Sequence, residues 1–443
     1  ERARRILQEV GELRALARGS VGLFGDRLSI GVLPSVGAYF MPIANRRLHR
    51  LYPDLRLLVH EGATVALLDL LREGRLDAVI ATPTRDPAFE SAPLFVETLW
   101  ICTASDDPLF VTLVDPPAYF IARLDNHGVP LFFRRDDQEV FDFRHHALTN
   151  EYSYARRTGE SVASGRPQTE RVVLDAGFEE VARLRTGGLD HTGHHEFLTL
   201  PGDLALMMAY PERDGGEGIE DSAFQLLSRE DGDVVFEWNT RDHVAVDEQT
   251  YPEHDDEYAH LNAVSVDDDG HYLASFRGLS QVMKIASDDG TVLWRLGGKR
   301  GDFRFVDDPL GGLCGQHLPT RLDDGNLLLF DNGQNCWPPN EARGERTRVV
   351  EYALDVERGE ARLVWSHERP GTYSRRQGSA QRLANGNTLI GWGFGPELLV
   401  SEVTASGETV FELGVESDDD TPVHGYRAYR FADRVSDASR GGR

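Results

Sequence analysis

The pattern of apolar and polar positions changes near residue 110. In residues 1–26 apolar side chains recur at helical spacing, which predicts an amphipathic helix. Short apolar runs then predict strands over residues 28–33, 55–60 and 77–81, with helices over about 38–51 and 64–72 and a strand-like segment over 94–103. Strands that alternate with helices indicate βαβ units on a parallel sheet, so residues 27–110 read as an α/β fragment.

From residue 111 a different pattern repeats, in which a turn rich in Asp and Gly precedes a strand with alternating apolar residues. The six copies span residues 124–132, 174–182, 230–238, 287–294, 354–365 and 405–411. Their starts are about 50 to 70 residues apart, a spacing typical of propeller blades. Earlier Asp-Gly or Asn-Gly turns at residues 268–273, 323–329 and 384–390 are strong hairpin signals.

The repeat predicts a mainly β fold, a six-bladed β-propeller over residues 111–431. Residues 426–431 would form a strand that closes the ring against the first blade, residues 111–135. A two-sheet sandwich is the competing architecture, but the long and irregular spacing favours the propeller. Residues 432–443 are expected to form a disordered tail.

Charge separates the same two parts. The chain has 47 Lys+Arg and 73 Asp+Glu, of which residues 1–110 hold 13 and 14, so residues 111–443 hold 34 and 59. Only Lys284 and Lys299 are lysines. This acidic composition predicts a halophilic protein, since salt screens self-repulsion, although a GC-rich genome also favours Arg over Lys. It argues against nucleic acid as a partner, which needs clustered cations.

The chain shows no membrane segment and no metal motif. No run reaches the ~18 apolar residues of a membrane span, and the charged start at Glu1 does not resemble a signal peptide. Cys102 reads as a core residue, whereas Cys314 and Cys336 could pair or remain free. His191, His194 and His195 could ligate zinc, but no matching Cys or carboxylate set accompanies them, so we expect no metal and no cofactor.

Candidate chemistry lies at four places near the start of predicted inner strands: His194-His195-Glu196-Phe197, His260-Leu-Asn262, Arg277, and Gly315-Gln316-His317. The inner segments of a propeller line its central channel, where such residues converge. Imidazoles, a guanidinium and a carboxamide would form a pocket of donors without a carboxylate, which suits an anion. A neutral imidazole there could be a nucleophile or a proton carrier. Taken singly, each histidine is more often a hydrogen-bonded structural residue.

The stretches Leu28-Ser-Ile-Gly-Val-Leu-Pro-Ser35, Leu51-Tyr-Pro-Asp-Leu55 and Leu71-Arg-Glu-Gly-Arg-Leu-Asp-Ala-Val-Ile80 resemble a LysR-type transcriptional regulator. They are similar to the first half of its effector-binding domain, closest to the peroxide-sensing branch, and the helix over residues 1–26 resembles that family's linker helix. In that family an effector lies in a cleft that would be reached here by Ser35 and Thr64. The second subdomain, the DNA-binding helix-turn-helix and the peroxide-sensing cysteine pair are not recognised, so we expect a non-functional cleft, from a fusion, a truncation or an artefact.

Residues 111–431 resemble a second family, the arylsulfotransferases that use no nucleotide sulfate donor. The motifs are the His-Glu-Phe element at His195, Tyr258-Ala-His-Leu-Asn-Ala-Val264, Arg277 followed by Lys284-Ile285, Thr291-Val-Leu-Trp-Arg-Leu-Gly-Gly298, Gln316-His317, and Leu329-Phe-Asp-Asn-Gly333. The resemblance implies a six-bladed propeller that needs no cofactor. It also implies export from the cytoplasm.

The resemblance assigns roles to single residues. His317 would match the nucleophile that becomes sulfohistidine, and His195, His260 and Arg277 would hold the oxygens of the sulfuryl group or move the proton. Asn262 and Gln316 would bind substrate. The partners would be a phenolic sulfate donor and a phenol acceptor. Two alternatives remain: a non-catalytic propeller that binds an anionic or aromatic ligand or a partner protein, and the remnant of a LysR-type regulator.

Overall fold

The structure is a computed structural model that divides into two compact units, residues 1–99 and 100–443. It describes residues 27–53, 55–81, 89, 105, 107–115, 118–161, 167–213, 218–250, 257–334, 336–340, 343–395, 398–415 and 424–431. Cys102, the helix expected over residues 1–26, the strand-like segment at 94–103 and the tail at 432–443 lie outside these ranges. Within the described part, no helix is long and apolar enough to cross a bilayer.

The first unit is the predicted α/β fragment. Its parallel sheet has the strand order β2-β1-β3 and contains β1 (Arg27–Val32), β2 (Arg56–Glu61) and β3 (Ala78–Ile80). Two helices connect the strands, α2 (Pro34–Leu51) and α3 (Thr64–Arg72). Helix α2 begins four residues before the expected position because Pro34 occupies its first turn, where the fixed φ of proline favours a helix start.

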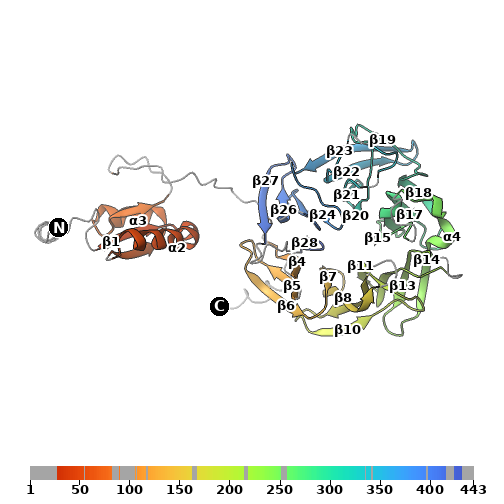
Figure 1. The fold of residues 1–443 in the computed structure, drawn as a ribbon, viewed down its shortest axis with the longest axis horizontal. Coiled ribbons are helices and arrows are strands. Elements are labelled where there is room, and N and C mark those ends of the chain that lie inside the picture. The colour runs from red at the N-terminus through yellow and green to blue at the C-terminus, as the bar shows by residue number, and fades with distance from the viewer. Residues whose placement is uncertain are drawn as a thin grey trace, which may run out of the picture. The chain divides into compact units, whose positions relative to one another are not determined.

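The second unit is a six-bladed β-propeller, as predicted, which excludes the sandwich (Figure 1). Blade 1 has the strand order β28-β4-β5-β6, blade 2 β7-β8-β9-β10, blade 3 β11-β12-β13-β14, blade 4 β15-β16-β17-β18, blade 5 β20-β21-β22-β23-β19 and blade 6 β24-β25-β26-β27. The neighbouring strands within these sheets are antiparallel, except that β19 pairs parallel to β23 as a fifth strand.

The strand bounds are as follows: β4 (Leu109–Asp115), β5 (Ala118–Leu124), β6 (Pro130–Asp136), β7 (Val140–His146), β8 (Glu151–Ser161), β9 (Pro167–Leu174), β10 (Glu180–Leu184), β11 (Thr192–Leu200), β12 (Leu204–Ala209), β13 (Ala223–Ser228), β14 (Val234–Asn239), β15 (Leu261–Val266), β16 (Tyr272–Phe276), β17 (Gln281–Ile285), β18 (Val292–Gly297), β19 (Arg304–Val306), β20 (His317–Arg321), β21 (Leu327–Asp331), β22 (Arg348–Asp355), β23 (Glu360–Glu368), β24 (Ser379–Arg382), β25 (Thr388–Gly391), β26 (Leu398–Val403), β27 (Thr409–Gly414) and β28 (Ala428–Arg430). Short helices α4 (Thr240–His243), η1 (Val246–Glu248) and η2 (Arg277–Leu279) join strands of blades 3 and 4.

The six repeated turns all occupy one position in the blade, between its third and fourth strands. The turn in residues 287–294, for example, joins β17 to β18, and the turn in residues 405–411 joins β26 to β27. The earlier Asp-Gly and Asn-Gly turns join the first and second strands of blades 4, 5 and 6. Tight hairpins need positive φ, which Gly290 and Gly325 supply. The repeated turn therefore marks the connection between the third and fourth strands of every blade.

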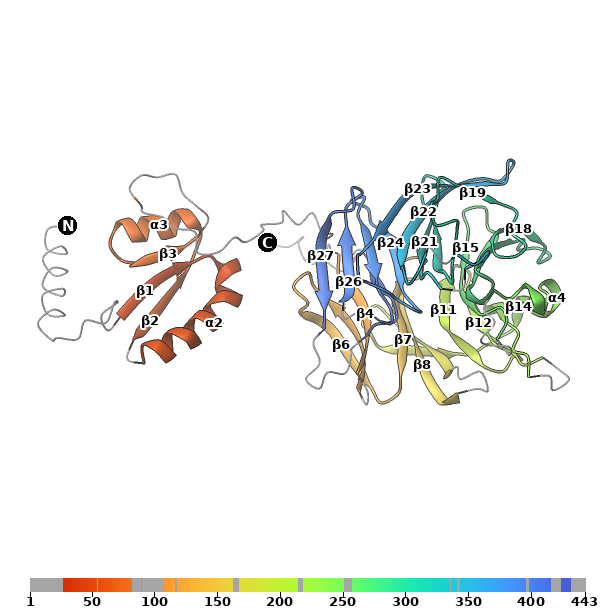
Figure 2. The same ribbon diagram turned by 45° about the horizontal axis from the view of Figure 1, so that its top comes forward.

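The ring is closed by the end of the chain. Strand β28 pairs antiparallel with β4, with Tyr429 opposite Phe110, so blade 1 contains strands from both ends of the propeller. Apolar side chains of neighbouring blades then pack against one another, as the ring of Phe224 in blade 3 does, edge to face, with that of Tyr272 in blade 4. This packing holds the innermost strands around a common axis (Figure 2).

Candidate functional site

The candidate residues come from the inner segments of blades 3, 4 and 5, which face the centre of the ring in Figure 1. His195 lies within β11, Asn262 within β15, and His317 begins β20. Arg277 differs from the expectation, because it follows the second strand β16, in the tight turn η2.

His317 is held as one tautomer by its neighbours. The Nδ2 group of Asn332 donates to the carbonyls of Ser374 and Gln377, both at 3.0 Å, so its Oδ1 faces His317 as an acceptor. That oxygen lies 2.7 Å from Nδ1 of His317, which therefore carries the proton. The Nε2 atom is left with its lone pair and accepts the backbone N–H of Gln377 at 3.2 Å. His317 is thus prepared with an unprotonated Nε2.

The surroundings of His317 also keep it neutral. Its side chain is buried, and burial is the largest cause that holds its pKa well below 6.5. The positive charges of Arg277 and Arg427 lower the pKa further, whereas the bond to Asn332 acts against this. A neutral imidazole at ordinary pH is the form that can attack an electrophile.

Backbone hydrogen bonds fix Arg277 against the segment that carries His260. The Arg277 N–H donates to the His260 carbonyl at 2.9 Å, and the Gly278 N–H donates to the Ala259 carbonyl at 2.9 Å. A Cβ on Gly278 would lie 2.5 Å from the Tyr258 oxygen, so only glycine permits this approach. The guanidinium of Arg277 donates to Oε1 of Gln334 at 2.6 Å. Arg277 and His260 are therefore set by one rigid turn.

His260 contacts a carboxylate, which corrects the expectation of a pocket without one. Oε1 of Glu257, three residues earlier, is in contact with Nδ1 of His260. The two side chains are only 9% and 15% exposed. The backbone of His260 has φ +52°, a left-handed conformation unusual for histidine, and its carbonyl is the acceptor for Arg277.

His195 lies beside His260 but has a different partner. Their ring centroids are 5.3 Å apart. The Tyr210 hydroxyl donates to the Leu261 carbonyl at 2.7 Å, so at 2.5 Å from His195 its oxygen accepts the Nδ1–H of that imidazole. The neutral Tyr210 thus holds His195, and a carboxylate holds His260.

The carboxamides of Asn262 and Gln316 connect the inner strands. Asn262 Nδ2 donates to the Gln316 carbonyl at 2.7 Å. Gln316 Nε2 donates to Oγ of Ser275 at 3.0 Å and to the carbonyls of Phe276 and Gln281 at 3.3 and 3.0 Å. These bonds join blade 5 to blade 4 directly before His317, and a role of either residue toward substrate stays a prediction.

A buried cluster of ions lies next to these residues and was not foreseen. Arg427 donates to Asp142 at 3.2 Å, to Glu196 at 3.1 Å and to the Asn262 carbonyl at 2.8 Å. Arg144 and Arg171 also face Asp142, at 3.3 and 3.7 Å. Burial would raise the pKa of Asp142, but the three guanidinium groups hold it below its usual value. Of this cluster, Arg427 lies near enough to His317 for its positive charge to lower the pKa of that histidine.

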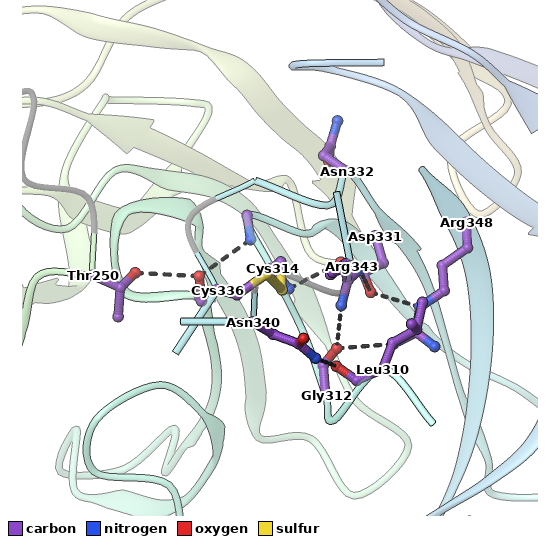
Figure 3. Close-up of a disulfide and its surroundings, with 12 residues drawn as sticks. Thr250, Leu310, Gly312, Cys314, Asp331, Asn332, Cys336, Asn340, Arg343 and Arg348 are labelled. Atoms are coloured by element: carbon purple, nitrogen blue, oxygen red, sulfur yellow. Dashed lines mark hydrogen bonds and ion pairs between the residues drawn. A yellow bond between two sulfur atoms is a disulfide. The ribbon is translucent and has the colours of Figure 1, made fainter. Parts of the chain in front are cut away.

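Cys314 and Cys336 form a disulfide, which settles the alternative left open by the sequence. Cys314 precedes β20 and Cys336 follows β21, so the bond joins the inner ends of this hairpin (Figure 3). The Cys314 carbonyl accepts the N–H groups of Gly333 and Gln334 at 3.0 and 3.2 Å. The Cys314 N–H donates to Asp331 at 2.9 Å, and Arg348 holds the same carboxylate at 3.0 Å. The disulfide therefore flanks both His317 and the Gln334 partner of Arg277.

Four further residues around the histidines had no predicted role. Asn332 lies in the Leu329–Gly333 motif, and its role could have been found, because a hairpin with its turn at 323–325 places the residues around 331 beside His317. Glu257 is three residues from His260, but no motif marks it. Gln377 precedes β24 of blade 6, which packs against blade 5, whereas Tyr426 precedes β28 and comes near His195 only when the ring closes. The Tyr426 ring centroid lies 6.0 Å from that of His195, and burial holds its pKa well above 10.0.

The structure places one of the two expected cleft residues of the first unit. Thr64 is the first residue of α3. Ser35 lies in α2, but its side chain is outside what the structure describes. A binding role of these residues stays untested.

Two protein families match the chain. The family described as "Arylsulfotransferase (ASST)" matches residues 194–416, just over half of the chain and blades 3 to 6. The family "LysR substrate binding domain" matches residues 22–151. That second match extends beyond the first unit, since residues 109–146 form propeller strands. Because these strands pair within blades 1 and 2, this stretch belongs to the propeller.

Individual relatives cover the N-terminal region. A "Hydrogen peroxide-inducible genes activator" of Pectobacterium carotovorum is 37% identical over 109 residues, which are 24% of this chain and 36% of that protein. The "DNA-binding transcriptional dual regulator OxyR" of Escherichia coli is 35% identical over the same shares. The chain thus spans about a third of the length of these relatives. A crystal structure of a protein of unknown function from Bacteroides caccae covers 73% of this chain and 98% of its own, with 14% identity and a TM-score of 0.47.

Proposed function

The chain belongs to the arylsulfotransferase family, and from this premise we propose that it moves a sulfuryl group from a phenolic sulfate ester to a phenol through a sulfohistidine at His317. The observation that carries the proposal is the state of His317. Its Nδ1 proton is held by Asn332, its pKa lies well below 6.5, and its Nε2 lone pair is unprotonated. A buried imidazole in this state is a nucleophile.

The proposed reaction has two halves. In the first, Nε2 of His317 gives up the hydrogen bond from the Gln377 N–H and attacks the sulfur, the bond from sulfur to the phenolic oxygen breaks, and the phenolate leaves with a proton. In the N-sulfated ring, Nδ1 keeps its proton and still donates it to Oδ1 of Asn332. The positive charge of this ring is offset by the negative charge of the attached sulfonate. In the second half a phenol loses its proton, attacks the sulfur and releases His317. Such double displacement predicts ping-pong kinetics.

Charge around the nucleophile suits this chemistry. The transferring group carries negative charge on its oxygens, and Arg277 offers a fixed guanidinium held by Gln334 and by the turn against His260. Donors fixed before the reaction stabilise such charge without reorganisation. Arg427 adds a second positive charge that acts on His317.

Release of nitrophenol from 4-nitrophenyl sulfate by the full chain, in molar salt, tests the proposal. We expect release that depends on added phenol and falls by at least about 10³-fold in His317→Ala. Mass spectrometry of the protein with donor alone should find one SO₃ group on the peptide that contains His317. His127→Ala is the matched control, because His127 is exposed in a hairpin of blade 1 and should leave release unchanged.

The alternative is a propeller that binds an anionic or aromatic ligand without turning it over. Full-length, folded protein that binds the ester but releases no nitrophenol with any phenol would favour this alternative. For the first unit we propose a regulator remnant, based on its likeness to the peroxide-sensing activators.

A further inference from the structure

The neighbouring histidines His195 and His260 differ in the group that contacts Nδ1, and this difference separates their roles. We propose that Glu257 and His260 form the acid–base pair of the sulfuryl transfer, in which Glu257 is a positioning residue and His260 carries the proton, while His195 stays neutral. The inference rests on the proposed function and specifies which group protonates the leaving phenolate.

The contact of Glu257 with His260 defines the tautomer. A carboxylate only accepts hydrogen bonds, so Nδ1 of His260 carries the proton that faces Glu257. The remaining ring nitrogen, Nε2, is then the atom that can give up and take back a proton. The carboxylate also stabilises the imidazolium form, because opposite charges attract strongly where both side chains are mostly buried. His260 can therefore alternate between its charged and neutral forms.

The orientation of His260 is fixed from the backbone side as well. Its carbonyl accepts the N–H of Arg277, which holds the backbone of His260 in its left-handed conformation with φ +52°. The residue is thus held at two points, by Arg277 at the main chain and by Glu257 at Nδ1 of the ring. A proton carrier needs such fixed geometry relative to the group that holds the sulfuryl oxygens.

His195 lacks these conditions. Its Nδ1–H is accepted by the hydroxyl of Tyr210, a neutral group whose own proton is committed to the Leu261 carbonyl. The side chain is buried at 4% exposure, so a positive charge on its ring would be costly. His195 is therefore suited to donate or accept a fixed hydrogen bond, and not to change its charge during the reaction.

The step balances without any further reactant. In the first half, the N–S bond forms at His317, the S–O bond breaks, and the Nε2 proton of charged His260 moves to the leaving oxygen. In the second half, the proton of the incoming phenol moves to Nε2 of His260 while its oxygen bonds to sulfur and the N–S bond breaks. Glu257 stays ionised throughout, and His260 ends in the form in which it began.

A leaving-group series tests the pair on the full chain. The first turnover is measured with aryl sulfates whose phenols range from the acidic 4-nitrophenol to phenol itself, since a general acid matters most for the more basic leaving groups. Glu257→Gln keeps the shape and removes the charge. We expect it to slow the turnover of phenyl sulfate by about 10²-fold and that of 4-nitrophenyl sulfate by less than about 10-fold. The dependence on leaving-group pKa thus becomes steeper.

Tyr210→Phe is the matched control, because it removes the partner of His195 in the same way. We expect it to slow all esters by a similar factor and to leave the slope unchanged. Glu257→Ala should regain turnover of phenyl sulfate when formate is added, which a merely structural role would not allow. A uniform loss in Glu257→Gln, or a steeper slope in Tyr210→Phe, would overturn the assignment. Wild type inactive on every ester would instead overturn the proposed function, and this pair with it.

Discussion

At the scale of single residues, Asn332 determines what His317 can do. Its Oδ1 is turned toward Nδ1 by two hydrogen bonds from its own amide to the carbonyls of Ser374 and Gln377. We expect Asn332→Leu to lower the rate of the first half-reaction by about 10²-fold, since the wrong tautomer would place the proton on Nε2. Stopped-flow release of nitrophenol measures this rate. An unchanged burst rate in folded protein would show that Asn332 does not select the tautomer.

The depressed pKa of His317 has a consequence for stability. In the unfolded chain this imidazole takes up a proton near pH 6.5, whereas burial and Arg277 keep it neutral in the folded protein. Below pH 6.5 the unfolded state therefore binds more protons, so its relative free energy falls as the pH falls. The stability contributed by the neutral ring is complete above pH 6.5 and declines below it.

This linkage predicts a difference between wild type and His317→Gln. The free energy of unfolding of the wild type should decrease more steeply from pH 7.5 to pH 5 than that of the variant. Urea unfolding at several pH values, in the same salt, gives both slopes. His146 and the other titrating groups remain in both proteins and cancel in the comparison. Parallel slopes would contradict a depressed pKa at His317.

At the scale of elements, the disulfide joins the two ends of the β20–β21 hairpin, directly before His317. The bond closes a loop with a sequence separation of 22, for which chain entropy predicts about 3 kcal/mol of stabilisation. Reduction should therefore lower the free energy of unfolding by roughly this amount. Sulfuryl transfer should also weaken, because Gln334, the partner of Arg277, lies two residues before Cys336. Urea unfolding and nitrophenol release, with and without dithiothreitol, measure both effects.

The variant Cys314→Ser with Cys336→Ser provides the control for reduction. It should have the stability of the reduced wild type and should not respond to dithiothreitol. Cys102 stays in place in both proteins, so an effect of the reagent that persists in the double variant would assign the response to another group and contradict the role of this bond.

The elements also show which parts of the fold can be predicted from the sequence. Six Asp- and Gly-rich turns predicted the six blades, because a hairpin turn is a local signal that fixes strand order within about ten residues. Ring closure by residues 426–431 followed from the same pattern. Glu257, Gln377 and the cluster around Arg427 were missed, because their partners lie in other blades or carry no motif. The contacts of Arg427 depend on ring closure, those of Gln377 on the packing of blade 6 against blade 5, and the contact of Glu257 with His260 is local but has no motif that marks it.

At the scale of the whole molecule, most of the acidity lies on the propeller. Residues 111–443 hold 59 acidic against 34 basic residues. Many of the basic ones are used inside the fold, as Arg171, Arg348 and Arg427 are, each 2% exposed or less. Buried carboxylates such as Asp142 and Asp331 pair with these arginines, so the solvent-facing side keeps most of the excess of negative charge. At 0.1 M salt, charges within about 10 Å still repel one another, whereas at 1 M the range falls to about 3 Å.

We therefore expect the melting temperature of the propeller to rise strongly from 0.1 M to 2 M KCl, as followed by tryptophan fluorescence. Replacement of exposed turn aspartates with Asn, at Asp268, Asp288 and Asp323, should raise stability at low salt and leave it nearly unchanged at high salt. The slope against salt would then decrease. The buried ion pairs of Asp142 should not respond, because salt screens them little. If the three substitutions leave the slope unchanged, the salt effect arises from burial of apolar surface, and the acidic surface reflects composition alone.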